Sequence, residues 1–417
     1  MRTILINAGP LVSFHGGHGT FHEDSVMSVG MGIVIENEQI AKIQSSDELA
    51  QEYSIDENGR TDSDVRVIDL CASAVVPGLI DAHTHLLWAG DRSKEVRWRR
   101  EGLSYAEIAE RGGGIQHTVR ETRKATDEQL FELGYTRLRE ALRTGTTHLE
   151  AKSGYGLSTE SELRLLSLGH RLNKIQVLPS LDLTWMGAHD VPPEHTKESY
   201  VEHLLSEQLP EVVEQGYARS ADVFCEPGWF DIEDSEAILS ASRGEGLALR
   251  MHIDEFVDGQ GGELAASLGV ETADHAYHTP IESRLNMRDA NVTTGFLPGT
   301  PYAMGDAWPN MKEILDNDIP FSLATDFNPN CRTLSLPFMA SLMVQRCKMH
   351  PLHALHAITA GAAKSMPHPS GNIHGKLVPG AVANLNIVDG PSWEAVTLQP
   401  TGTPFKATVL NGQFIAH

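Results

Sequence analysis

The stretch Val75–Arg92, VVPGLIDAHTHLLWAGDR, contains the pattern that decides the fold of this chain. It begins with a run that is apolar almost throughout and short enough to be a strand buried on both faces. Side chains two residues apart on a strand point to the same side, so His83 and His85 should converge just past the strand's C-terminal end. Two converging imidazoles are half of a divalent-metal site. The alternative is two ordinary histidines among the chain's 20, but an apolar strand, paired histidines and a Gly/Asp turn coincide here.

Downstream of this stretch, apolar segments of strand length alternate with helical patterns. One helix is well delimited, because Thr126 can cap it with Gln129 three residues on and Gly145 follows its end. Such alternation predicts a parallel sheet. The expected strands are Val75–His83, Thr146–Lys152, Ile175–Gly187, Asp222–Glu226, Leu247–Ile253, Glu271–His275, Val292–Leu297 and Phe321–Asp326. Eight parallel strands with helices between them predict a closed (β/α)8 TIM barrel, whose reactive groups lie at the C-terminal strand ends.

Short β segments flank this alternation on both sides. The expected strands before it are Thr3–Asn7, Gly32–Ile35, Ile40–Ile43 and Val65–Leu70, and those after it are Leu385–Val388 and Lys406–Ile415. The last run can fold back on itself through the turn dipeptide Asn411–Gly412. Neither piece has enough strands to bury a face, so we expect one small composite β-sandwich formed by both termini. The predicted parts are 1–75 and 371–417 for the β-sandwich and 76–370 for the catalytic barrel.

Metal-ligating side chains gather at the predicted strand ends. The first strand carries His83 and His85, and the fifth, sixth and eighth carry His252, His275 and Asp326. Each could be an ordinary strand-end residue, but their joint placement on one rim favours a metal site. A catalytic zinc-type site needs about three N or O ligands and an open position for water.

Two further strand-end residues, Lys152 and Glu226, could be ligands of a second metal ion. Lys152 ends strand two rather than strand four, which argues against a carbamylated lysine that bridges two metals. Glu226 ends strand four instead, and its carboxylate is the candidate ligand for a second ion.

The charge and the cysteine spacing exclude several classes of protein. The formal net charge of −23 repels phosphate backbones, so nucleic acid is not an expected partner. No run is long and apolar enough for a membrane helix, and the first residues lack the order of a signal peptide. The four cysteines are far apart and show no CxxC spacing. We therefore expect a cytoplasmic protein with reduced thiols and no membrane partner.

Several motifs resemble those of known proteins. PGLIDAHTH, MHIDEF, ADHAYH, ATDFNP and PGAVANLNIV resemble the amidohydrolase superfamily. Within it, GDRSKE, SYAEIAERGGGIQHTVRETRKA, EAKSGYGL, GAHDVP, DVFCEPGWF and DEFVDGQGGELAASLG resemble the imidazolonepropionase family of histidine degradation. The resemblance implies that water opens the ring of 4-imidazolone-5-propanoate at its amide bond, giving N-formimidoyl-L-glutamate. It also implies a homodimer and one Zn²⁺ or Fe ion per chain, held by His83, His85, His252 and Asp326.

The chemistry suggests roles for three further groups. Asp326 touches the metal and can also accept a proton from the attacking water. Glu255 lies three residues past His252, where it could bond the ring nitrogens and shuttle a proton; the alternative there is a solvated acid. His275 could polarise the carbonyl or stabilise the developing oxyanion.

The substrate's propanoate needs a cation, and a guanidinium is its natural two-pronged partner. Arg92, just beyond the first strand, matches the carboxylate-binding arginine of the family. Tyr155, His189 and Asn328 match further substrate-contacting positions. After Asn328 and Pro329 the family pattern continues with Gly and then Ser or Thr, whereas this chain has the candidate contacts Asn330 and Cys331.

Two other functions fit parts of the sequence. A different cyclic amidase or deaminase acting on an aryl or purine-like ring would share the metal set but would not require Arg92. A metal-dependent scaffold or storage protein would use the ligands but would leave Glu255, Tyr155 and Arg92 without a role.

Overall fold

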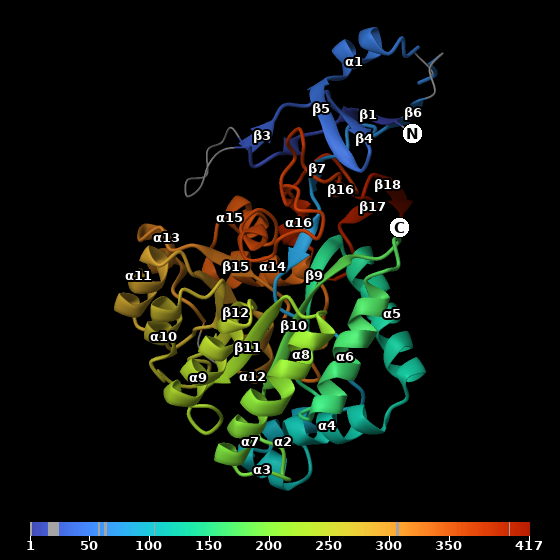
Figure 1. Cartoon of the computed structure of the whole chain (residues 1–417). Coiled ribbons are helices and arrows are strands. Elements are labelled where there is room, and N and C mark those ends of the chain that lie inside the picture. The colour runs from blue at the N-terminus through green and yellow to red at the C-terminus, as the bar shows by residue number, and fades with distance from the viewer. Residues whose placement is uncertain are drawn as a thin grey trace.

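The structure, a computed structural model, describes residues 2–15, 25–56, 59–61, 65–103, 105–305, 308–399 and 401–417. Eight parallel strands form a barrel, and two further sheets lie at one end of it, on the side where both termini are found (Figure 1). The barrel strands follow one another in chain order: β8 Leu79–Asp81, β9 Thr146–Lys152, β10 Ser180–Ala188, β11 Ser220–Cys225, β12 Ala248–Ile253, β13 Thr272–His275, β14 Thr293–Phe296 and β15 Phe321–Leu323. This confirms the predicted (β/α)8 barrel.

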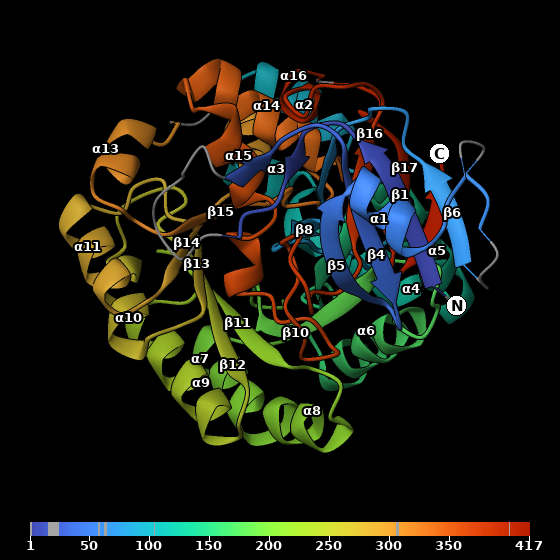
Figure 2. The same cartoon turned by 90° about the horizontal axis from the view of Figure 1, so that it is seen from above.

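Helices surround the barrel, as the view along it shows (Figure 2). Those between the strands are α2 Lys94–Arg100, α3 Tyr105–Glu110, α4 Gly114–Lys124, α5 Asp127–Arg143, α6 Thr159–Leu172, α7 Lys197–His203, α8 Leu209–Gln215, α9 Ile232–Gly244, α10 Gly261–Leu268, α11 Ile281–Asp289, α12 Gly299–Met304 and α13 Met311–Asp316. After β15 come α14 Leu336–Cys347 and α15 Pro351–Ala357. The predicted cap of α5 is present, since Thr126 and Gln129 bond each other's backbone in a capping box.

The barrel closes through the residues that follow its first and last strands. Thr84 and Phe327 form an isolated parallel bridge. On either side of it, the Asp326 amide donates to the His83 carbonyl and the His85 amide to the Phe327 carbonyl. His83, His85 and Asp326 therefore lie where the barrel closes, and the hydrogen bonds that close it fix their backbones.

The first predicted barrel strand differs from the expectation. Val75–His83 is two strands rather than one, because β7 Val75–Pro77 pairs in a neighbouring sheet and β8 alone enters the barrel. The break is at Gly78, where an added Cβ would lie 2.4 Å from the Thr147 hydroxyl oxygen. Such close packing against β9 leaves room only for glycine. The predicted start of the third strand is also wrong, because β10 begins at Ser180.

Two sheets form the β part of the molecule. One has the order β5-β4-β1-β6, with β1 Arg2–Ala8, β4 Met31–Glu36, β5 Gln39–Ser45 and β6 Val65–Asp69. The other has the order β18-β17-β16-β7-β2-β3, with β2 Leu11–Val12, β3 Val26–Met27, β16 Leu385–Val388, β17 Phe405–Leu410 and β18 Gln413–Ala416. The second sheet thus joins strands from both ends of the chain, as expected for a composite sandwich.

Apolar side chains bind these layers together. One buried cluster contains Leu5 and Ile33 from the first sheet and Leu385 and Val409 from the second. A different cluster contains side chains of both the second sheet and the barrel, so packing does not separate the two parts. The predicted division at residues 75 and 370 stays a prediction. The β17–β18 turn has positive φ at Asn411 (48°) and Gly412 (77°), as the dipeptide predicts.

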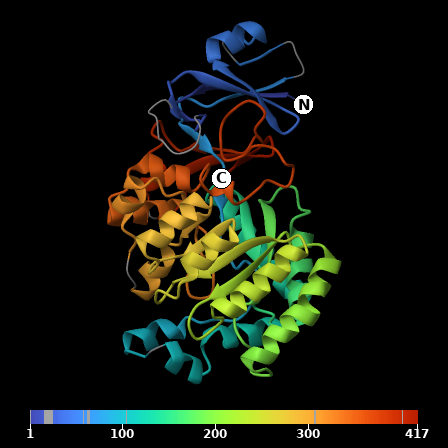
Figure 3. The same ribbon diagram turned by 60° about the vertical axis from the view of Figure 1, so that its left-hand side comes forward.

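The β sheets lie against the N-terminal end of the barrel. The Asn386 amide on β16 donates to the carbonyl of Gly145, which directly precedes β9. Helices α2 to α4 lie at the opposite end, where the strands finish (Figure 3). The reactive groups of such barrels lie at this end, where the strands finish. Within the described part of the chain, no helix is long and apolar enough to cross a membrane.

Candidate active site

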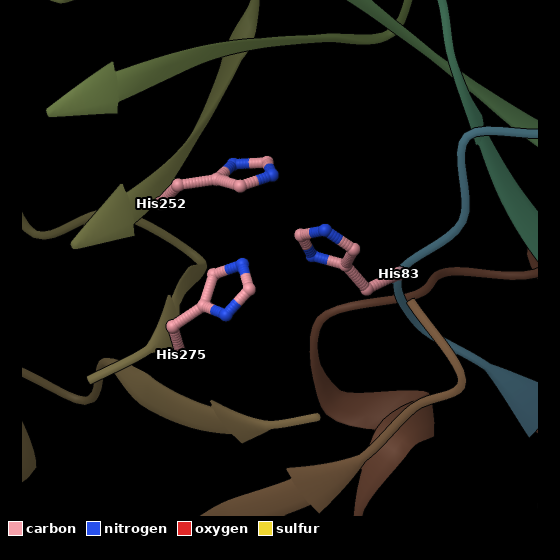
Figure 4. Close-up of side chains that lie close together, drawn as sticks. All are labelled: His83, His252 and His275. Atoms are coloured by element: carbon pink, nitrogen blue, oxygen red, sulfur yellow. The ribbon is translucent and has the colours of Figure 1, made fainter. Parts of the chain in front are cut away.

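Five side chains that could ligate a metal meet at the C-terminal end of the barrel. His83 and His85 follow β8, His252 lies on β12, His275 ends β13 and Asp326 follows β15. Two overlapping groups have ligand atoms that all lie within 4.8 Å of one another: His83, His252 and His275 form one, and His83, His85 and Asp326 the other. The three rings of the first group point toward one another, His252 and His275 from two strands and His83 from the segment after β8 (Figure 4). His83 belongs to both groups and is the centre of the cluster.

The chemistry of these side chains fits a divalent metal. All five are buried, with exposures of 4% or less. His83 Nε2, His85 Nδ1, His252 Nε2 and His275 Nδ1 have no hydrogen-bond partner among the described residues. Buried polar atoms are normally paired, because leaving one without a partner costs about 1–3 kcal/mol. Unpaired ring nitrogens in a buried cluster of this kind fit a metal site.

Two aspartates contact the Nδ1 atoms of His83 and His252. Asp274 Oδ2 lies 2.6 Å from His83 Nδ1, and Asp222 Oδ1 lies 2.9 Å from His252 Nδ1. A carboxylate in this position keeps the proton on Nδ1 and turns Nε2 toward the metal. Lys152 in turn bonds Asp222 Oδ2 at 2.5 Å, so it serves an aspartate rather than a metal.

Burial keeps the imidazoles of His83, His85 and His275 neutral. Burial, followed by the charge of Lys152, holds the pKa of His83 well below its usual range. Burial likewise lowers the pKa of His85 and of His275, with neighbouring histidines adding to the effect. Burial also raises the pKa of Asp326 to about 6, and the Thr300 hydroxyl donates to its Oδ2 at 2.9 Å. Neutral imidazoles can coordinate a cation without first losing a proton.

Backbone strain coincides with two of these positions. His275 and Asp326 have φ angles of 66° and 48°, a left-handed conformation that non-glycine residues rarely adopt. Each costs on the order of 1–3 kcal/mol and persists only when the surrounding structure holds it. Such strain is commonly found at functional sites, and here it occurs where two strand ends reach the cluster.

A pocket adjoins the cluster and brings the other candidates together. Its wall contains almost every residue singled out from the sequence: His85, Arg92, Tyr155, His189, His252, Glu255, His275, Asp326, Asn328, Asn330 and Cys331. His83 is not among the described residues that line the pocket. An aromatic wall that was not predicted from the sequence also lines the pocket: Phe224 and Phe256 pack around Trp229, with ring centroids 4.9 and 5.8 Å from that ring.

Arg92 is already engaged by a carboxylate. Its Nε and Nη2 donate to the two oxygens of Glu95 at 2.8 and 2.9 Å, and both residues are buried. With its amide turned to satisfy both neighbours, Asn330 accepts from Arg92 Nη2 at 3.0 Å and donates to Glu95 at 3.3 Å. Arg99 adds a second cation, 3.7 Å from Glu95. The guanidinium is thus held rigidly at the pocket wall.

The remaining polar candidates occupy distinct places in the pocket. Glu255 Oε2 lies 3.6 Å from His275 Nε2. His189 Nδ1 contacts the Gly154 carbonyl at 2.8 Å, and its ring lies 5.0 Å from that of Tyr155. Burial lowers the pKa of His189 to about 3, so this imidazole is neutral at physiological pH.

The segment after Asp326 forms a tight turn. Asn328 Oδ1 accepts from the amides of Asn330 and Cys331 at 2.7 and 3.2 Å. Burial raises the pKa of the Cys331 thiol to about 12, so it remains protonated. Asn330 and Cys331, which depart from the expected pattern, both line the pocket.

Glu226, the candidate ligand for a second metal ion, bonds backbone amides instead. The groups of described residues that could hold a metal do not include it. Its carboxylate instead accepts from the amides of Glu255, Phe256 and Val257. A signal for it was present, as for Asp222 and Asp274, because acidic residues within or next to a fully buried strand need a specific partner.

Comparisons with known proteins agree with this site. The chain is 36% identical over 399 residues to imidazolonepropionase from Symbiobacterium thermophilum, covering 93% of this chain and 91% of the relative. It is 38% identical over 383 residues to imidazolonepropionase from Geobacillus kaustophilus, covering 91% and 88%. No protein-family model matches the chain.

Solved structures show the same fold at low sequence identity. An adenosine deaminase from Xanthomonas campestris with bound zinc has a TM-score of 0.70 at 13% identity, covering 99% of this chain and 92% of that one. A guanine deaminase from E. coli has a TM-score of 0.69 at 15% identity, covering 100% and 99%. At such identities the likeness concerns the fold alone. The sequence relatives, in contrast, share more than a third of their residues over nearly the whole chain. The chain belongs to the imidazolonepropionase family.

Proposed function

We propose that this chain opens the ring of 4-imidazolone-5-propanoate with water and releases N-formimidoyl-L-glutamate. Water adds to the ring carbonyl, the amide C–N bond breaks, and the leaving nitrogen takes up a proton. The observation that carries the proposal is one pocket wall that joins a metal-competent histidine cluster to a fixed guanidinium, Arg92. The family membership supports the same reaction.

The proposed metal is one Zn²⁺ or Fe ion per chain. His83, His85, His252 and Asp326 are its proposed ligands, and His275 is close enough to share in the coordination. Nitrogen and oxygen ligands of this kind suit zinc and iron alike. When bound, the ion supplies Lewis acidity and makes water nucleophilic at neutral pH.

Protein side chains would move the protons. Asp326 is the proposed base that takes a proton from the attacking water. Glu255 would contact the ring nitrogens and carry a proton to the leaving nitrogen. His275, 3.6 Å from Glu255, would polarise the carbonyl and stabilise negative charge on its oxygen.

Other residues would bind and orient the substrate. Arg92 is the proposed partner of the propanoate, with Asn330 beside it. Tyr155 and His189 would contact the ring, and their close packing suits a planar group. Asn328 and Cys331 would complete the wall next to Asp326.

The test is a comparison of substrates on the purified, metal-loaded protein. Imidazolonepropanoate is unstable and would be generated in situ. We expect hydrolysis of it and no deamination of adenosine or guanine. Deamination without hydrolysis of imidazolonepropanoate would support the alternative, an amidohydrolase that acts on an aryl or purine-like ring.

The homodimer and the cytoplasmic location expected from the sequence stay predictions. Light scattering of the purified protein would test the first. Fractionation of cells that produce the protein would test the second.

A further inference from the structure

The loop that carries Glu255 is held by a buried carboxylate from the neighbouring strand. Glu226 directly follows β11 and is 1% exposed. Its Oε2 accepts from the Glu255 amide at 2.9 Å, and its Oε1 accepts from the amides of Phe256 and Val257 at 3.0 and 3.1 Å. Three consecutive backbone donors thus converge on one side chain, and Glu255 is the first of them.

The far side of the same loop is held in a similar way. Asp254, with a φ of 47°, is fully buried. Its oxygens accept from the amides of Gly259, Gly261 and Gly262 at 3.0 to 3.3 Å. Both sides of the loop that follows β12 are therefore fixed by carboxylates, although Val257, Asp258 and Gln260 in this loop are exposed.

The arrangement recurs at a second pocket residue. Tyr155 lies on the loop after β9, and Glu162 of α6 accepts from the amides of Gly154, Gly156 and Leu157 at 2.8 to 2.9 Å. Glu162 is also fully buried. An added Cβ at Gly156 would lie 2.7 Å from Glu162, so the fit is close. The same device thus holds two separate loops, and each loop carries a residue of the pocket.

From these contacts we infer that Glu226 is a positioning residue that fixes the Glu255 carboxylate beside His275. The inference rests on the proposed function, in which Glu255 moves a proton. A surface loop held only by its ends would let that carboxylate sample many positions. Small misplacements of a reacting group are costly, since about 1 Å of error can cost roughly 100-fold in rate.

The test is a double-mutant cycle with Glu226→Gln and Glu255→Gln in the metal-loaded, full-length protein. The glutamine keeps the size of Glu226, but its NH₂ group cannot accept from a backbone N–H. We expect Glu226→Gln to lower kcat roughly tenfold to hundredfold with unchanged metal content. In the Glu255→Gln background the same substitution should change kcat less than about twofold, because the group that it positions is already gone.

Glu162→Gln is the matched control. It removes the same kind of carboxylate from an equally buried site, but it acts on the Tyr155 loop. Its effect should therefore persist in the Glu255→Gln background. If the loss from Glu226→Gln also persisted there, Glu226 would act on the fold as a whole and the inference would fail. It would also fail if Glu226→Gln alone retained full turnover.

A second measurement does not depend on a variant that folds. Amide hydrogen exchange of the wild-type protein should show slow exchange at Glu255, Phe256 and Val257, comparable to that of β12. Exchange there as fast as at exposed loop residues would overturn the inference. If the wild-type protein does not hydrolyse imidazolonepropanoate, the proposed function fails, whatever the exchange shows.

Discussion

Asp222 Oδ1 lies 2.9 Å from His252 Nδ1, and both side chains are buried inside the barrel. This contact assigns the ring its tautomer, because a carboxylate beside Nδ1 keeps the proton there and leaves Nε2 for a metal. Burial alone would raise the pKa of Asp222, but His252 and Lys152 outweigh it and hold this pKa below its usual range. The aspartate therefore stays ionised.

Replacing Asp222 should weaken metal binding without removing a ligand. Asp222→Asn keeps the shape but loses the charge, and we expect a roughly 10–100-fold lower metal affinity. Competition with a chelator of known affinity measures this. The control is Asp182→Asn, a similarly buried aspartate that pairs with Arg219 instead of a histidine. A metal affinity that falls equally in both variants would contradict a specific role for Asp222.

Arg92 should determine the affinity for the substrate's carboxylate. Arg92→Ala removes the guanidinium, and we expect kcat/KM to fall by about 2–5 kcal/mol in transition-state terms, with unchanged metal content. Arg92→Lys should recover only part, because an ammonium cannot make the two-pronged contact. Steady-state kinetics and elemental analysis measure both quantities.

Arg97 is the control for Arg92. It lies on α2, which begins two residues after Arg92, but its side chain is 71% exposed and its partner is the surface residue Glu101. Arg97→Ala should leave the kinetics unchanged. Near-normal kcat/KM of Arg92→Ala on imidazolonepropanoate would refute the carboxylate-binding role.

Glu255→Gln should retain the metal and lose most turnover. The substitution preserves shape but removes the proton-carrying group, and such groups contribute roughly 10²–10⁴-fold. Asp258→Asn, an exposed change in the same loop, should have little effect. Activity of Glu255→Gln within a few-fold of the parent would eliminate the proton-transfer role.

Three buried histidines far from the site should make stability fall in mild acid. His148, His368 and His374 lie with ring centroids 5.3 to 5.7 Å apart. Burial, followed by the charge of His374, lowers the pKa of His368 to about 4, against about 6.5 when unfolded. Between these two pKa values the unfolded chain binds more protons than the folded protein does. The contribution to stability is therefore full above about pH 6.5 and falls toward about pH 4.

Urea unfolding between pH 4 and 8 measures this dependence. His368→Gln should flatten the fall in the free energy of unfolding, whereas the exposed His278→Gln should not. A pH profile of His368→Gln that parallels the parent would show that His368 does not titrate on unfolding.

The fold could largely be predicted from the sequence, but the first strand could not. Apolar residues on both sides of Gly78 look like one continuous run. Only the packing of Gly78 against Thr147, which is 69 positions away in the chain, separates the run into strands of two sheets. Hydrophobic pattern carries no information about such a contact.

The candidate site, too, could be predicted from the sequence only in part. His83, His85 and Asp326 follow from strand ends and residue chemistry, since those ends must meet on one rim. The Glu95 that holds Arg92 and the Glu226 that holds the Glu255 loop act through partners set by the tertiary fold. Glu95 looks like an ordinary surface residue until its burial is known. The buried strand before Glu226 indicates that its carboxylate needs a partner, but not which partner.

The most direct test of the account is a metal titration of the stripped protein, with in situ imidazolonepropanoate as substrate and N-formimidoyl-L-glutamate as the measured product. We predict negligible product without metal and a linear rise in activity that saturates at one equivalent of Zn²⁺ or Fe²⁺ per chain. Full activity in the metal-free protein, saturation only at two equivalents, or no product at any metal concentration would contradict it.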